Sequence, residues 1–81
     1  MAIRSIKAGI KHSHIYLNLV LIRTIHGRFC VKGCVTLIKT PEINLISEAW
    51  NMLAAFDTEG EGVEFMDNLA VSWSRLDIAN V

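Results

Sequence analysis

The sequence has few of the features that mark a secreted, disulfide-stabilised or membrane-spanning protein. It contains two cysteines and one proline, whereas small secreted scaffolds are held together by several disulfides. No run reaches the ~18–20 uninterrupted apolar residues of a spanning helix, because Arg23 and Lys32 break the best candidates. Arg4, Lys7 and Lys11 precede an apolar run, but no small-residue cleavage site follows it, as a signal peptide requires. We therefore expect a cytoplasmic protein without a membrane segment.

The sequence also lacks a catalytic or metal-binding motif. Cys30 and Cys34 would stand about 13 Å apart on a strand, too far for a disulfide or a shared zinc ion, so we expect small buried core residues. His12 and His14 are two ligands where a structural zinc site has four, and we expect both, like His26, at the surface. No serine or cysteine stands in a recognisable context with histidine and aspartate. We therefore expect neither an enzyme nor a cofactor.

Apolar residues are abundant for so short a chain. They make up 52% of the 81 residues, above the usual ~45–50%. A single domain of about this size buries only about 60% of the surface that its unfolded chain exposes. One copy cannot easily hide so much apolar surface from water, so we expect a homo-oligomer, most simply a dimer, or an obligate partner.

Acidic residues are absent from the first half of the chain. Residues 1–40 carry seven bases and no acid, whereas residues 41–81 carry eight acids and one base, Arg75. The net charge of zero therefore combines halves of +7 and −7. This asymmetry indicates either that the halves attract each other, within one fold or across a dimer, or that they form interaction surfaces.

The longest β-prone stretch, residues 14–39, predicts a hairpin. A loop at residues 26–28 would place Leu17 opposite Leu37 and Leu19 opposite Val35, which gathers the strongest apolar residues on one face. A shorter turn at His26 and Gly27 is the competing choice, but it would mix the two faces. The opposite face is also partly apolar, with Tyr16, Val20, Ile22, Cys34 and Ile38. A sheet apolar on both faces is usually covered on both.

The second half of the chain shows helical periodicity. A helix is predicted over residues 41–56, because Thr40 suits the N-cap and Pro41 the first helical position. A second helix is predicted over 61–76. Trp50 and Trp73 lie on the apolar faces of these helices, and we expect both in the core.

The predicted fold is a single α+β domain. It combines a two- or three-stranded antiparallel sheet, built on the hairpin, with two C-terminal antiparallel helices joined by an acidic loop at 57–62. Residues 1–13 form a short helix or a strand, and the spacing of Ile3, Ile6 and Ile10 favours the helix. Residues 77–81 form a tail.

Five acids around the start of the second predicted helix are the candidate partner-binding residues: Asp57, Glu59, Glu61, Glu64 and Asp67. The stretch 57–62 resembles the opening of an EF-hand calcium loop. It then departs from that pattern, because Glu64 and Asn68 stand where the loop has an apolar residue and a bidentate glutamate. A helix N-terminus stabilises acids by its dipole. The same charges also predict an acidic patch that docks on a basic surface of another protein.

Three function classes follow from these features. The first is a small non-enzymatic interaction protein, a regulator or inhibitor of a macromolecular partner, of the kind common among phage- and plasmid-encoded inhibitors. The alternative is a nucleic-acid-binding regulator that uses Arg23, Arg28 and Lys32, since a two-stranded ribbon can enter a major groove. These bases are spread among apolar residues, and dedicated nucleic-acid binders are usually strongly basic. The third is a subunit that completes a larger enzyme.

Overall fold

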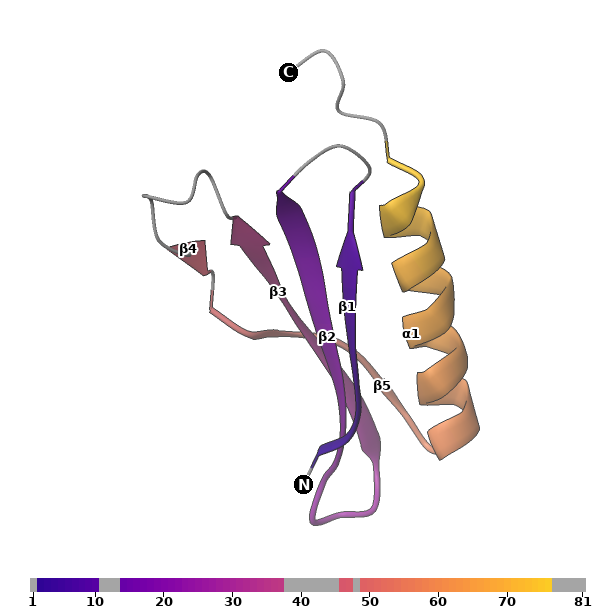
Figure 1. The fold of residues 1–81 in the computed structure, drawn as a ribbon. Helices are drawn as coiled ribbons and strands as arrows, with labels where there is room; N and C mark the ends of the chain where they lie inside the picture. Colours follow the sequence, from indigo (N-terminus) through magenta and orange to yellow (C-terminus); the bar gives the residue numbers. More distant parts are fainter. Residues whose placement is uncertain (1, 11–13, 38–45, 48, 77–81) are drawn as a thin grey trace.

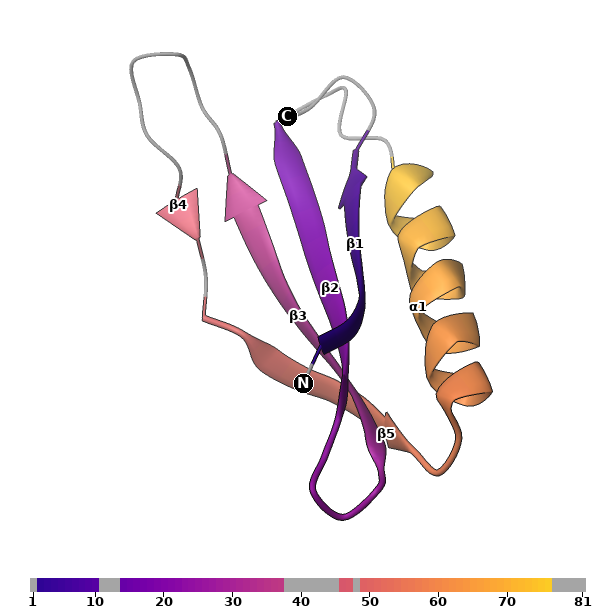
Figure 2. The ribbon, with the colours of Figure 1, turned by 60° about the horizontal axis from the view of Figure 1, so that its bottom comes forward.

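The computed structural model describes residues 2–10, 14–37, 46–47 and 49–76. The elements in chain order are β1 (Ala2–Gly9), β2 (Ile15–Arg23), β3 (Phe29–Leu37), β4 (Ile46–Ser47), β5 (Asn51–Phe56) and α1 (Glu59–Ser74). They form two layers, a twisted sheet and one helix that lies along one of its faces close to β1 (Figures 1 and 2). All strand pairs are antiparallel.

The first three strands follow one another across the sheet in the order of the chain. β1 pairs with β2, and β2 pairs with β3. The fourth position is shared, because β4 pairs with Thr36 and Leu37 at one end of β3 while β5 pairs with residues 29–33 at the other. The sheet is therefore four-stranded in width, with a fourth strand in two pieces, and β1 is the opposite edge.

The core lies between the sheet and α1. Leu17, Leu19 and Leu21 alternate along β2 toward the helix and are buried there with Val31 of β3 and Met66 of α1. Burying an aliphatic side chain of this size contributes ~1.5–3 kcal/mol to folding. These few residues thus carry much of the stability, and partly buried side chains from β1, β5 and α1 pack around them.

α1 begins at a capped and closely packed end. The side chain of Thr58, the N-cap residue, accepts a hydrogen bond from the backbone N–H of Glu61. Gly62 in the next turn is buried, and a Cβ atom at this position would lie 2.7 Å from Cδ1 of Leu21. The absence of a side chain at Gly62 therefore allows the helix to approach β2 closely.

The prediction of two C-terminal helices is wrong, because α1 is the single helix in the described part of the chain. Ile46–Ser47 and Asn51–Phe56, which lie inside the predicted helix 41–56, are strands. β3 needs a partner along this side for its backbone N–H and C=O groups. β5 supplies one, with Phe56 opposite Phe29. Thr40 and Pro41, on which the predicted cap depended, lie outside the described residues.

The predicted N-terminal helix and the predicted sheet of two or three strands are also wrong. Ala2–Gly9 is strand β1, and its addition together with β4 and β5 widens the sheet to four strands. The helical spacing of Ile3, Ile6 and Ile10 was misleading, because Ile6 packs beside the core from a strand. Tertiary pairing with β2 outweighs a weak local pattern over so few residues.

The hairpin register differs from the predicted one by two residues. Leu17 lies opposite Val35 and Leu19 opposite Gly33. The loop covers residues 24–28 and is closed by the backbone N–H of Thr24, which donates to the carbonyl oxygen of Arg28 at 2.8 Å. A shift of two residues keeps each side chain on its face. Leu17, Leu19 and Leu21 therefore lie on the core face of β2, as predicted. Ile25, which was predicted on the same face, lies in the loop and is 96% exposed.

Candidate functional site

The five predicted partner-binding acids lie before and along α1, and all are exposed. The predicted acidic loop at 57–62 is instead largely the first turn of the helix, with Glu59 and Glu61 near its N-terminus. The hydroxyl group of Thr58 donates a hydrogen bond to Oε1 of Glu61 at 2.8 Å. Because the helix dipole is positive at this end, it stabilises these carboxylates electrostatically.

Two of these acids form ion pairs with bases from the first half of the chain. Nη2 of Arg4 lies 2.9 Å from Oδ1 of Asp67, and Nε of Arg28 lies 3.4 Å from Oδ1 of Asp57. All four side chains are about half exposed or more, so each pair contributes only about 0–1 kcal/mol. Part of the charge division between the halves is therefore neutralised inside the fold.

Glu59, Glu61 and Glu64 form no ion pair with any described residue. Glu61 and Glu64 flank a shallow hollow of about 280 Å³ beside Phe56 and Phe65. The centroids of the two phenyl rings are 5.5 Å apart. This arrangement places carboxylates next to an aromatic surface on the outside of the molecule.

The three predicted nucleic-acid-binding residues are not brought together. Arg23 is the last residue of β2 and Arg28 the last residue of the hairpin loop. The guanidinium of Arg23 lies 5.9 Å from the ring centroid of Phe29, and Arg28 pairs with Asp57. Lys32 is in the middle of β3, next to the buried core residue Val31, and points to the opposite face of the sheet. The side chains therefore do not form one basic surface.

The side of the sheet away from α1, here called the open face, is not covered by any described helix or strand. Its residues alternate with those of the core: Ser5, Lys7, Tyr16, Asn18, Val20, Ile22, Cys30, Lys32, Cys34, Thr36, Trp50 and Met52. Trp50 is 51% exposed and Met52 64% exposed. The expectation that Trp50 belongs to the core is therefore wrong, whereas Trp73 is half-buried and packs against the core cluster.

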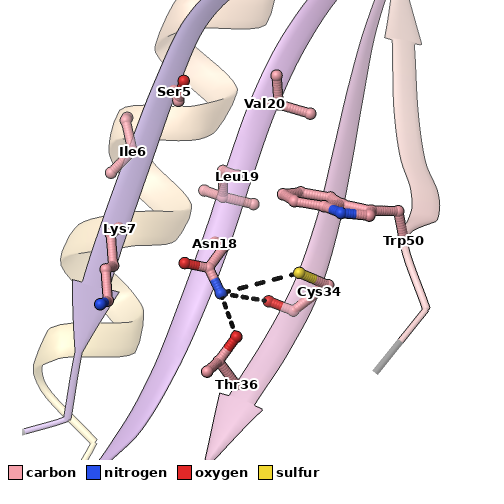
Figure 3. A pocket seen from close by; sticks show the side chains of 9 residues that line it. All are labelled: Ser5, Ile6, Lys7, Asn18, Leu19, Val20, Cys34, Thr36 and Trp50. Atoms are coloured by element: carbon pink, nitrogen blue, oxygen red, sulfur yellow. Dashed lines mark hydrogen bonds between the residues drawn. The ribbon is translucent and has the colours of Figure 1, made fainter. Parts of the chain in front are cut away.

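A pocket of about 530 Å³ lies on the open face. Figure 3 shows Trp50 reaching from the β5 side toward β2, with Lys7 on the opposite side of the pocket. Nδ2 of Asn18 donates to Oγ1 of Thr36 at 2.6 Å, which fixes the amide between the two walls. Nζ of Lys7 lies 4.5 Å from the ring centroid of Tyr16. The pocket thus combines an exposed indole, one ammonium group and a held amide.

Sequence reasoning missed the contribution of Trp50 and Met52 to this surface, because residues 41–56 were assigned to a helix. One signal was available. Thr58 and Glu61 have the spacing of a helix capping box, which indicates that a helix begins at residue 58. The short apolar run before it is as compatible with a strand as with a helix.

The described residues hold no group of three or more histidine, cysteine, aspartate or glutamate side chains that could bind a metal ion. Cys30 and Cys34 are free and buried on β3. His14 and His26 are exposed, whereas His12 lies outside the described residues.

Comparison with family models, with curated proteins and with solved structures found no match for this chain. In the part of the chain that the structure describes, no helix is both long enough and apolar enough to cross a membrane.

Proposed function

We propose that this chain is a small non-enzymatic protein–protein interaction module, a regulator or inhibitor that binds a basic surface of a macromolecular partner. The observation that carries the proposal is that Glu59, Glu61 and Glu64 are exposed and form no ion pair with any described residue, whereas Asp57 and Asp67 pair with Arg28 and Arg4. These three residues, here called the acidic helix surface, are the docking site. Unpaired charges on a rigid element favour fast and selective association with a partner of opposite charge.

The aromatic hollow beside these acids supports the proposal. Phe56 and Phe65 lie next to Glu61 and Glu64, so a lysine or arginine of the partner would meet a carboxylate with its charge and a ring with its apolar stem. Aromatic residues near the centre of a polar interface often carry most of the binding free energy. The partner is therefore expected to present basic side chains with long aliphatic stems.

The test is capture of partners from the native host by the tagged chain, with identification by mass spectrometry. The partner is expected to be lost when Glu59, Glu61 and Glu64 are all changed to Lys. The control is Ser72→Lys with Ser74→Lys, which places lysines on exposed residues at the C-terminal end of the same helix. If the triple variant retains every partner of the wild type, the acidic helix surface is not the docking site.

A homodimer and a cytoplasmic location belong to the same proposal. β1 is an edge strand in the described sheet, and pairing of two β1 strands across a twofold axis would extend the sheet without covering either face. Light scattering at tens of micromolar is expected to give twice the chain mass. The mass of one chain would count against the dimer.

The alternative of a nucleic-acid-binding regulator has less support, since Arg23 and Arg28 lie near the loop while Lys32 lies on the open face. A gel shift at low salt separates the two proposals. Binding that weakens steeply with salt and is lost on Arg23→Gln would favour nucleic acid.

A further inference from the structure

We propose that the open face of the sheet is a second docking surface, and that its occupant is an acidic amphipathic segment of another protein. The proposed function uses the outer side of α1, so this inference concerns the opposite side of the molecule. Three observations carry it: exposed apolar side chains, two lysines with no acidic residue among the described residues of this face, and a pocket lined by Lys7 and Trp50.

The apolar part is contributed by β2, by β5 and by Trp50, the residue before β5. Trp50 and Met52 are more than half exposed, and Met52 lies opposite Lys32, which in turn lies opposite Val20. Trp50 and Val20 both line the pocket. Contiguous exposed apolar side chains of this kind indicate an interaction site, and an aromatic side chain at the side of a pocket is a typical anchor.

The charged part is of one sign. Lys7 and Lys32 are the charged side chains among the described residues of the open face, and none of these residues is an aspartate or glutamate. A second copy packed through the same face would bring lysines against lysines and would bury Lys32 without a carboxylate. Desolvating an unpaired ammonium group is strongly unfavourable. The occupant must therefore supply the acids itself.

The spacing of the two lysines indicates the form of the occupant. Lys7 on β1 lies opposite Asn18 on β2, and Asn18 lies opposite Cys34 on β3. Lys32 is two residues before Cys34 on the same strand. With strands ~4.8 Å apart and a rise of ~3.4 Å per residue, the two Cα atoms are about 12 Å apart, on either side of β2. Two turns of a helix span about 11 Å. A helix with acids two turns apart would reach both lysines, and its apolar residues between them would meet Val20 and Trp50.

A single-stranded nucleic acid is the less favoured occupant. Base stacking needs several free aromatic faces and a continuous basic track. The open face offers Trp50 alone, because the ring of Tyr16 already has the ammonium group of Lys7 over it at 4.5 Å. Two lysines are also few for a phosphate backbone.

The experiment is selection of random dodecapeptides, displayed on a carrier, against the intact chain. The enriched peptides are synthesised, and their affinities are measured by fluorescence anisotropy for the wild type and for Lys32→Glu, Met52→Glu and Trp50→Ala. Trp50 and Met52 are exposed and Lys32 is partly exposed, and circular dichroism checks that each variant is folded. The matched control is Glu64→Lys, on the acidic helix surface.

Enriched peptides are expected to combine apolar residues with acids two helical turns apart. Each open-face variant should weaken their binding by about tenfold or more, and Glu64→Lys should leave it unchanged. Exchange for lysine of the one peptide acid that meets position 32, tried at each of the two acids in turn, should restore binding to Lys32→Glu. These outcomes are independent of the acidic helix surface, so failure here and failure of the proposed function can be told apart.

Four outcomes would overturn the inference. They are the absence of enriched peptides, enriched peptides that depend on Glu64 and not on Lys32, binding of oligothymidylate that is lost on Trp50→Ala, and a dimer in sedimentation that dissociates on Lys32→Glu. The third would assign the face to nucleic acid, and the fourth to a second copy of this chain.

Discussion

Arg4 and Asp67 are 63 positions apart in the sequence, yet their side chains meet at 2.9 Å and join β1 to α1. The pair connects the first and last described elements and links a base of the positive half to an acid of the negative half. Part of the charge division between the two halves is therefore paired within the fold.

The first prediction concerns this ion pair. Arg4→Gln and Asp67→Asn should each lower the free energy of unfolding by less than about 1 kcal/mol, because both side chains are about half exposed and screened by water. Urea denaturation of the two single variants and the double variant gives the coupling free energy. A coupling of several kcal/mol, or one that persists in high salt, would contradict a surface ion pair.

The second prediction concerns the closest approach of α1 to the sheet. Gly62→Ala should lower the free energy of unfolding by about 1–2 kcal/mol, because a new Cβ meets the fully buried Leu21 at 2.7 Å and this cost exceeds the gain in helix propensity. Thermal and urea denaturation measure the change. Gly60→Ala is the matched control, since nothing lies within 4 Å of its added Cβ atom. Equal effects at the two glycines would argue against the packing.

The third prediction concerns the start of the helix. Thr58→Ala should destabilise the protein by about 1 kcal/mol, because the backbone N–H of Glu61 loses its side-chain acceptor. Thr58→Asp keeps an acceptor at the N-cap and should retain most of the stability. Circular dichroism during urea titration distinguishes the two variants. If Thr58→Ala and Thr58→Asp are equally stable, the cap contributes nothing measurable.

The fourth prediction concerns the two tryptophans. Trp50 is 51% exposed, whereas Trp73 packs against the core. In a Trp73→Phe variant, the remaining indole should emit at longer wavelength and be quenched readily by acrylamide. In a Trp50→Phe variant, emission should lie at shorter wavelength, with weaker quenching. The opposite order would indicate that Trp50 is buried in the core, and it would contradict the proposed role of Trp50 in binding at the open face.

Local pattern in the sequence was sufficient where it agreed with the tertiary contacts. The alternation of Leu17, Leu19 and Leu21 predicts a strand and its buried face, and both are confirmed. The register error of two residues does not change that face, because side chains alternate with period two. The region 61–76 was expected to be helical, and α1 covers Glu59–Ser74. Apolar periodicity and the acids of the first turn both favoured this assignment.

Local pattern was insufficient for Ala2–Gly9 and Asn51–Phe56. Both segments are short and have apolar spacings compatible with either a helix or a strand. β2 and β3 present backbone groups on both sides of the hairpin, and satisfying those groups decides the conformation of their neighbours. The same pairing leaves Trp50 exposed. Local periodicity therefore could not predict which side chains lie on the open face.

The sequence by itself determined the chemistry that is available: an apolar hairpin, seven of eight bases in the first half, five of eight acids between residues 57 and 67, and no catalytic motif. The tertiary structure alone decided how that chemistry is distributed. It paired Asp57 with Arg28 and Asp67 with Arg4, left Glu59, Glu61 and Glu64 without an ion pair among the described residues, and placed Lys7 and Trp50 on opposite sides of one pocket. The physical reason is that charge pairing and burial depend on contacts between distant segments, which local periodicity does not encode.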